Sequence, residues 1–239
     1  MGEHDIAKHT RALVNVIKSP GHLKHKIGDI ILEICIIVFA ITLSLFVERY
    51  REHQNEEKLE HSFLTNLVKD MKTDITQLKD DSTVYEKMRK NFDYLKQAYN
   101  GKKLNQDSAL RAANSLYNSV DFISSNSRYE ALKSSGKLDV IENNNLQLNI
   151  VNYYQQTLPS LLASTLAFSN FKFKLGEYTD YHFVIKGKET NIQELMESPV
   201  YYNFLNKDGF IKEIISRYHL TIMQSKSIIK EIESEEKNW

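Results

Sequence analysis

The sequence predicts an all-α fold, in which one N-terminal transmembrane helix continues into a long helix that packs in an extramembrane helical bundle. Three observations predict it. An apolar run of about 21 residues follows a short polar tail. Apolar residues after the run recur mostly every three or four positions, as on one face of a helix. Only three prolines and eight glycines occur in 239 residues, which leaves few places where a helix must stop.

Residues 27–47 form the predicted transmembrane helix. Counted from Ile27, the run gives roughly 31 Å of helix, which matches the hydrocarbon thickness of a bilayer. Glu33 is the only charged residue between Ile30 and Val47, and charged residues flank the run on both sides. The alternatives are a buried core helix, disfavoured by the length and the flanking charges, and a cleaved signal peptide, disfavoured by the long segment that precedes the run.

We expect the short tail, residues 1–26, to be cytoplasmic and residues 48–239 to lie in the periplasm, so that the chain crosses the inner membrane once. Close to the membrane each flank carries three basic residues, so the local count is tied. The tail adds Lys8 and Arg11, and short tails follow the positive-inside rule more closely than long domains. Residues 5–18 either form an amphipathic helix on the inner surface or are disordered.

Asp29 and Glu33 are the candidate residues for an intramembrane contact. They are four residues apart and therefore share one face of a helix. Asp29 lies near the helix N-terminus at the interface, where a negative charge is favoured, and fits a simple terminal anchor. Glu33 lies roughly 9 Å deeper than the start of the helix. A contact with a partner helix and a merely tolerated charge both stay open for Glu33.

A long amphipathic helix is predicted after the membrane segment, because no glycine or proline occurs between Val47 and Gly101. Its partner is another chain, as a coiled coil, or later helices of the same chain, and the weak charge pattern beside the apolar stripe favours the second. The apolar stripe consists of Leu64, Leu67, Met71, Ile75, Leu78, Tyr85, Met88, Phe92, Leu95 and Tyr99.

Capping residues and breakers divide the rest of the chain into further helices. The apolar face of the last helix is formed by Ile211, Ile214, Tyr218, Ile222, Ile229 and Ile232. In order, the predicted elements are a helix over 108–120, a helix after the loop 124–127 that Gly136 interrupts, a helix capped by 143–145 that runs through Phe173 with Pro159 as a kink or first-turn residue, a possible short strand over 178–185, short helices over 189–205 broken at Pro199, and a final helix over 210–233.

Composition and motifs argue against several functions. Lys plus Arg (31) equals Asp plus Glu (31), so no basic excess favours nucleic acid. Cys35 is the only cysteine, which excludes a disulfide within the chain and a thiolate metal site. The phosphate-binding, dinucleotide-binding, nucleophile-elbow and zinc-protease motifs are absent. We therefore expect a protein that is not an enzyme, with no cofactor.

Two local patterns are candidates for binding sites. His53, Glu57 and His61 follow at four-residue spacing, but two helical turns separate the outer two by roughly 12 Å. One metal ion cannot reach all three, so a solvated charged face is predicted and no metal site. The tyrosine pairs 153–154 and 201–202 are predicted to be core, because aromatic residues in amphipathic helices are more often buried than exposed.

Two stretches carry a resemblance to a known family. The first reads IGDIILEICIIVFAITLSLFVERYREHQNEEK and the second SRYEALKSSGKLDVIENNNLQLNIVNYY. Members start the membrane segment with Gly and an acidic residue, matched by Gly28 and Asp29. A later aromatic-x-x-Leu-x-x-x-Gly segment is matched by Tyr129, Leu132 and Gly136.

On these residues the chain resembles a large bacterial family of single-span membrane proteins that is known only as a domain of unknown function. The resemblance covers most of the chain. It implies one membrane helix and a helical domain, and it carries no activity. This chain has Glu48-Arg49-Tyr50 where the family usually has an aromatic-rich exit from the membrane, so the end of the membrane helix is not fixed by the resemblance.

A span and a packed domain without catalytic residues favour a membrane-anchored, non-enzymatic scaffold or protein-interaction module. The expected partners are the lipid bilayer and either another protein or further copies of the chain. One alternative is a subunit of a membrane transport or energy-coupling complex that uses Glu33. Another is a self-assembling membrane effector, which the lack of a small-xxx-small face on the span disfavours.

Overall fold

The computed structural model describes the backbone of residues 20–118 and 120–235, with side chains from Ile30 onwards. It contains two compact units, Met1–Lys58 and Leu59–Trp239. Helix α2 (Pro20–Lys96) contributes to both. The tail helix considered for residues 5–18 lies outside the described residues. Within them the secondary structure is almost entirely helical, as the sequence predicts.

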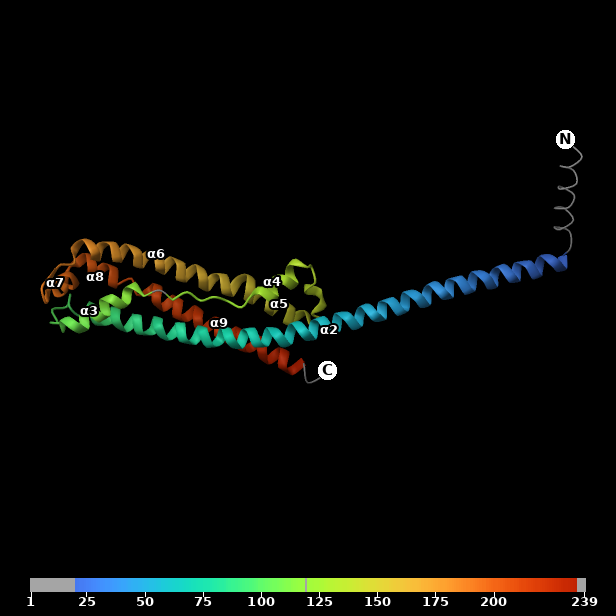
Figure 1. The fold of residues 1–239 in the computed structure, drawn as a ribbon, viewed down its shortest axis with the longest axis horizontal. Helices are drawn as coiled ribbons and strands as arrows, with labels where there is room; N and C mark the ends of the chain where they lie inside the picture. Colours follow the sequence, from blue (N-terminus) through green and yellow to red (C-terminus); the bar gives the residue numbers. More distant parts are fainter. Residues whose placement is uncertain (1–19, 119, 236–239) are drawn as a thin grey trace, which may run out of the picture. The chain divides into compact units, whose positions relative to one another are not determined.

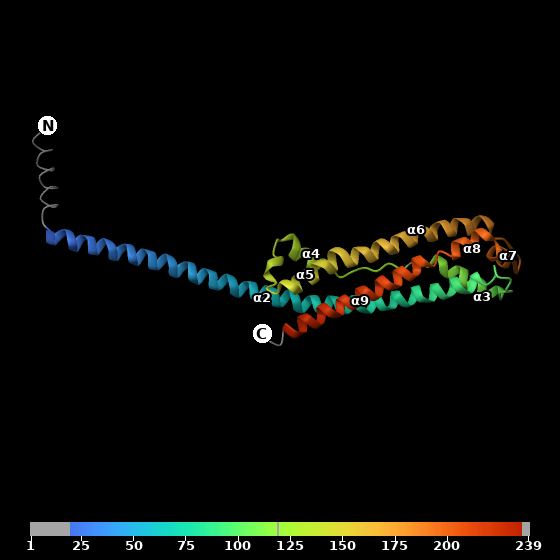
Figure 2. The same ribbon diagram turned by 180° about the vertical axis from the view of Figure 1, so that it is seen from behind.

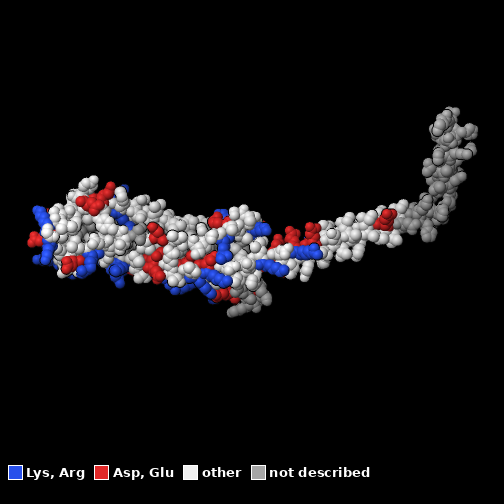
Figure 3. All heavy atoms as spheres, viewed as in Figure 1, with Lys and Arg blue, Asp and Glu red and all other residues white. Residues whose placement is uncertain are grey.

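The apolar part of α2 belongs to the first unit and is long enough to cross a membrane. Its apolar side chains are exposed: Phe39 is 66% and Phe46 68% accessible. A core helix of a soluble protein would be mostly buried, so that alternative does not fit. Thr42 satisfies its hydroxyl inside the helix by donating to the Val38 carbonyl at 2.8 Å, and Cys35 is exposed. Figure 3 shows the long white stretch that these residues form.

The second unit is a helical bundle. The end of α2, the whole of α6 (Leu158–His182) and α9 (Gly209–Glu235) lie side by side (Figures 1 and 2). The remaining elements are α3 (Gln106–Asn114), η1 (Ser115–Tyr117), α4 (Ser127–Ser134), η2 (Leu138–Val140), α5 (Asn144–Asn152), the π-helical turn η3 (Tyr153–Thr157), β1 (Ile185–Lys186), β2 (Glu189–Thr190), α7 (Ile192–Glu197) and α8 (Pro199–Leu205).

The core of the bundle is formed by the apolar stripe of α2 packed against later helices of the same chain. Every predicted stripe residue from Leu64 to Leu95 is buried. The Tyr85 ring lies 6.0 Å from Phe168 of α6 and 5.5 Å from Tyr218 of α9, measured between ring centroids. The predicted apolar face of the last helix is buried as well. The choice of later helices over a second chain as the partner of this stripe is therefore confirmed.

Tyr99 is an exception, since it was predicted to continue the stripe but is 42% exposed. Helix α2 ends at Lys96, three residues earlier, so Tyr99 no longer follows the helical phase. Its ring stacks on Tyr202 of α8 at 4.1 Å instead. Gly101 ends the turn with φ of 83°, and the Lys102 N–H donates to the Gln97 carbonyl, which is the hydrogen bond of a Schellman cap.

Two predicted elements differ from the structure. The strand expected over 178–185 is wrong, because α6 continues to His182 and only Ile185–Lys186 pairs with Glu189–Thr190. Helical spacing brings the rings of Tyr178 and His182 together at 4.1 Å, and the short strand pair that follows has little apolar surface to bury. The helix expected over 108–120 ends at Tyr117, and the chain from there to Asn126 forms no helix or strand in its described part.

The helix predicted to begin at the 143–145 cap is found. The Asn143 side chain accepts from the Asn145 and Leu146 N–H groups and so caps α5. The five-residue π turn η3 then links α5 to α6, with Pro159 in the first turn of α6. A proline cannot donate to the preceding turn, and the wider π turn places this defect at a helix junction rather than inside a regular helix.

Candidate functional site

The two carboxylates proposed for an intramembrane contact both lie on α2. Glu33 is exposed, and it makes no ion pair with any residue that the structure describes. The backbone of Asp29 is helical, while its side chain lies outside the described part. Whether the two share a partner is therefore untested, and both remain predictions.

The three residues weighed as metal ligands form a charged surface. His53 Nε2 lies 3.2 Å from Glu57 Oε1, and both side chains are about half exposed. No group of three or more histidine, cysteine or acidic side chains in the described part of the chain is close enough to hold a metal ion. The geometry of this face is that of an exposed helical ion pair.

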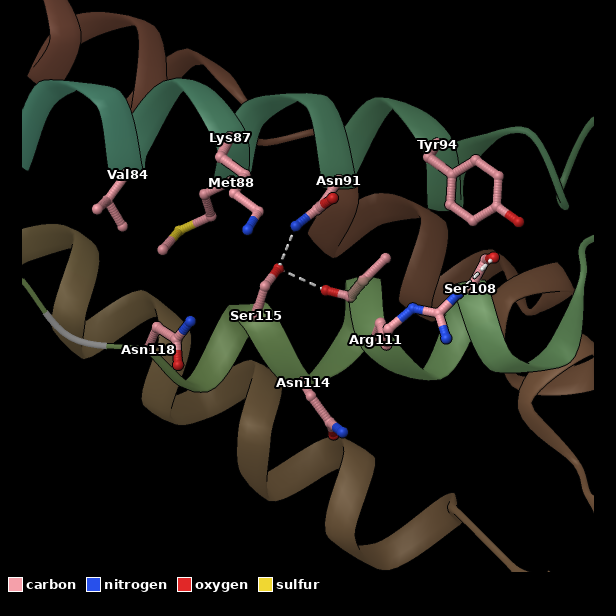
Figure 4. A pocket seen from close by; sticks show the side chains of 11 residues that line it. Val84, Lys87, Met88, Asn91, Tyr94, Ser108, Arg111, Asn114, Ser115 and Asn118 are labelled. Carbon is pink, nitrogen blue, oxygen red and sulfur yellow. Dashed lines mark hydrogen bonds between the residues drawn. The ribbon is translucent and has the colours of Figure 1, made fainter. Parts of the chain in front are cut away.

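A groove of about 700 Å³ lies between α2 and the segment formed by α3 and η1. Figure 4 shows the side chains that line it. The floor is apolar and the walls carry amides, hydroxyls and two cations. The lining residues are Val84, Lys87, Met88, Asn91, Tyr94, Ser108, Arg111, Ala112, Asn114, Ser115 and Asn118.

Local sequence explains why α3 sits beside α2 in this way. Asn105 caps α3 by accepting from the Ser108 N–H at 3.0 Å. The buried side of α3 is formed by Ala109, Ala112 and Ala113, and Ala112 also lines the groove beside α2. Asn91 Nδ2 donates to Ser115 Oγ at 2.6 Å, and this hydroxyl donates to the Ala112 carbonyl at 2.6 Å (Figure 4). These two bonds tie the end of α3 to α2.

The charges of the groove are unbalanced. Lys87 and Arg111 are exposed, and no carboxylate lines the groove. Arg111 donates to Ser108 Oγ at 3.1 Å, and neither cation makes an ion pair with a described residue. Arg89, on the same helix as Lys87, is paired with both Glu86 and Asp93. The groove is thus rich in hydrogen-bond donors and positive in character.

The segment that follows the groove is fixed to α2 by Asp74. This carboxylate is 1% exposed and accepts hydrogen bonds at 3.1 Å from the Ser124 hydroxyl and the Ser125 N–H. Burial raises the pKa of Asp74, although both serines act to lower it. Tyr85 contributes a further bond by donating to the Val120 carbonyl at 3.3 Å. Asp74 therefore has a structural role.

A second buried carboxylate, Asp81, is less well satisfied. Its Oδ2 and the hydroxyl of nearby Tyr218 make no hydrogen bond within the described part of the chain. Burial and the neighbouring Asp80 raise the pKa of Asp81. Burial also raises the pKa of Tyr85 to about 12. A tyrosine with so high a pKa stays protonated at neutral pH, so Tyr85 is not suited to act as a base there.

An uncharged surface on α6 was not recognised from the helical pattern. Residues 143–171 contain no charged residue and no histidine, which is visible in the sequence once charges rather than apolar spacing are followed. Along this stretch and just beyond it, apolar side chains point outwards: Leu148 is 56%, Leu162 40%, Leu166 64% and Phe173 68% exposed. The predicted tyrosine core is found, with Tyr153, Tyr154 and Tyr201 buried and Tyr202 half-buried.

Together these features define a helical protein with one helix that could span a membrane and no recognisable catalytic site among the described residues. Residues 33–180, more than half of the chain, match the model of a family of unknown function, DUF6090, and the chain belongs to that family. The predicted membership of a family of unknown function is confirmed, whereas the match says nothing about a membrane. Neither the curated proteins nor the solved structures contain a match.

Proposed function

We propose that the protein is a membrane-anchored, non-enzymatic interaction module, held in the inner membrane by residues 27–47 with its helical bundle in the periplasm. The observation that carries this proposal is the exposed apolar surface of α6, which we define by Leu162, Leu166 and Phe173 and which begins in the uncharged stretch 143–171. A contiguous apolar patch on a folded protein commonly marks a protein interaction site.

The absence of charge makes this surface unusual for the chain. Charged residues make up 26% of the sequence, so a stretch of 29 residues at that average would carry about seven or eight, and residues 143–171 carry none. Elsewhere on the bundle, acidic and basic side chains are interspersed (Figure 3). Desolvating charged groups opposes association, and a surface without them avoids that cost.

Contacts of α6 with α2 and α9 hold this surface in place. On the inner side of α6, Phe168 is fully buried and contacts Tyr85 and Phe92 of α2. Towards α9, Thr157 Oγ1 donates to Gln224 Oε1 at 2.5 Å and Ser164 Oγ to Glu213 Oε1 at 3.2 Å. A partner can bind such a fixed helix face without first ordering it, which limits the entropy lost on binding.

Partner capture from native membranes tests the proposal. The full chain is purified with its cross-linked partners, and Leu166→Lys is compared with the wild type and with Ile123→Lys, a change at a side chain that is 76% exposed outside α6. We expect Leu166→Lys to remove the cross-linked species and Ile123→Lys to retain it. Loss in both variants, or in neither, would contradict the role of the α6 surface.

The proposed orientation has its own test. A reporter enzyme fused after Trp239 should be active only if the bundle is exported, and protease added to the outside of spheroplasts should remove the bundle. Activity of a cytoplasmic reporter at the same position would reverse the topology. It would leave the interaction proposal intact, because the α6 surface does not depend on the compartment.

A subunit of an energy-coupling or transport complex is a second candidate, favoured by Glu33. This carboxylate is exposed on an otherwise apolar helix surface and has no ion partner among the described residues. A charge in the apolar part of a membrane is costly, so a partner helix or a proton would stabilise it. Glu33→Gln separates the readings: loss of activity with normal membrane insertion supports coupling, and an unchanged phenotype removes it.

A further inference from the structure

We propose that the groove between α2 and α3 binds an acidic peptide segment of a partner protein. This site is separate from the α6 surface and does not depend on it. The groove joins two cations that lack ion partners in the described chain to hydrogen-bonding side chains that suit a peptide backbone.

The two cations come from opposite walls. Lys87 projects from α2 and Arg111 from α3 (Figure 4). Ser108 accepts one N–H of the Arg111 guanidinium, which orients the group and leaves its other N–H donors free for a ligand carboxylate. Since no carboxylate lines the groove, a ligand with acidic side chains meets complementary charge and no repulsion.

Neutral groups at the two ends of the groove suit a polypeptide (Figure 4). The Asn118 side-chain amide and the Tyr94 hydroxyl make no hydrogen bond with another described residue, and an amide can both donate to a backbone carbonyl and accept from a backbone N–H. Met88 and Ala112 provide an apolar floor for the aliphatic parts of a ligand. A chain with carboxylates spaced along an extended backbone satisfies all of these groups.

The dimensions favour a chain segment over an enclosed small molecule. The volume of about 700 Å³ lies within the range of ligand sites, yet the space is partly open to solvent and bounded by helices on two sides. The Asn91, Ser115 and Ala112 bonds hold both walls in place, so the groove is formed before a ligand arrives.

Binding of a defined probe to the full chain in detergent micelles tests the proposal. The probe is a fluorescein-labelled peptide of alternating Glu and Ala residues, followed by anisotropy at low ionic strength. We expect saturable binding that weakens with salt, because exposed charge pairs are screened. The double change Lys87→Glu with Arg111→Glu should weaken binding by about tenfold or more, and the neutral double change to Gln by less.

The matched control reverses two exposed lysines of α9, Lys226 and Lys230, to glutamate, which changes the net charge equally. This control and Leu166→Lys should bind the probe as the wild type does. The proposal is overturned if the control loses as much affinity as the groove variant, if a peptide with Gln in place of Glu binds equally well, or if no saturable binding occurs. Complete displacement of the probe by inorganic phosphate at stoichiometric concentration would also overturn it, by making the groove a small-anion site. Circular dichroism establishes that each variant is folded.

Discussion

Replacing Asp74 by alanine should lower the free energy of unfolding of the bundle by about 2–4 kcal/mol. The substitution leaves the Ser124 hydroxyl and the Ser125 N–H without their acceptor in a part of the chain where Asp74 itself is 1% exposed. A buried donor that loses its partner costs about 1–3 kcal/mol, and since the two donors affected here are only partly buried, the lower part of this range applies to each. Asp74→Asn keeps one acceptor oxygen and should cost only about 1 kcal/mol.

The raised pKa of Asp74 determines how its contribution to the free energy of unfolding depends on pH. Because burial raises this pKa in the folded chain, the folded state binds a proton more readily than the unfolded state. The contribution of this group to stability is therefore fully present below the unfolded pKa and is lost as pH rises through the folded pKa. At neutral pH the stabilising effect of Asp74 therefore comes from the hydrogen bonds that its oxygens accept from Ser124 and Ser125, and burial of the charge opposes it.

Urea unfolding of the full chain in micelles, followed by far-ultraviolet circular dichroism, measures these changes. Asp80→Asn is the matched control, since Asp80 is an exposed carboxylate on the same helix and should change the free energy by no more than about 0.5 kcal/mol. A cost for Asp74→Ala no larger than that of the control would refute the view that Asp74 fixes the segment around Ser125 to α2.

Three further outcomes are expected. Asp81→Asn should stabilise the bundle by about 1 kcal/mol at neutral pH, since it removes a buried carboxylate with an unpaired oxygen. The gain in stability should shrink on acidification, because the raised pKa of Asp81 favours the folded wild type at low pH. Equal gains at neutral and acidic pH in urea titrations would contradict this. Gly136→Ala should lower the melting temperature and cost about 1 kcal/mol, because Gly136 has φ of 68° and the Lys137 N–H donates to the Leu132 carbonyl in a Schellman cap; calorimetry with no change would count against that reading. Glu33→Gln should insert into membranes at least as well as the wild type, as measured by carbonate extraction, since a charge in the apolar layer is penalised.

The sequence predicted the helical bundle well because its long helix carries a strict apolar pattern. From Leu64 to Leu95 the spacing alone gave the buried face of α2, and the cap at Asn143 gave the start of α5. The pattern was least informative near Tyr178, where aromatic and β-branched residues are typical of a strand although i,i+4 contacts continue the helix. The spacing of apolar residues also does not show where a helix ends. Tyr99 was therefore predicted to be part of the buried stripe, although α2 ends before it and its side chain is exposed.

The groove was not predictable, because its walls come from two different helices whose packing the sequence pattern does not show. Lys87 and Arg111 meet only through the packing of α3 on α2, and neither belongs to a recognisable motif. The uncharged surface of α6 could have been found from the composition of residues 143–171. Its outward direction, however, depends on which face of α6 packs on Tyr85 and Phe92, and a periodic pattern with apolar residues on both sides does not decide that.

The pairing of α2 with α9 imposes an order of events during biosynthesis. Lys72 and Glu233, which are joined by an ion pair at 2.7 Å, are 161 positions apart in the chain. At a translation rate of 5–20 residues per second, the apolar stripe of α2 waits on the order of ten seconds or more for its last covering helix. During that time the nascent chain exposes the apolar residues that later form its core.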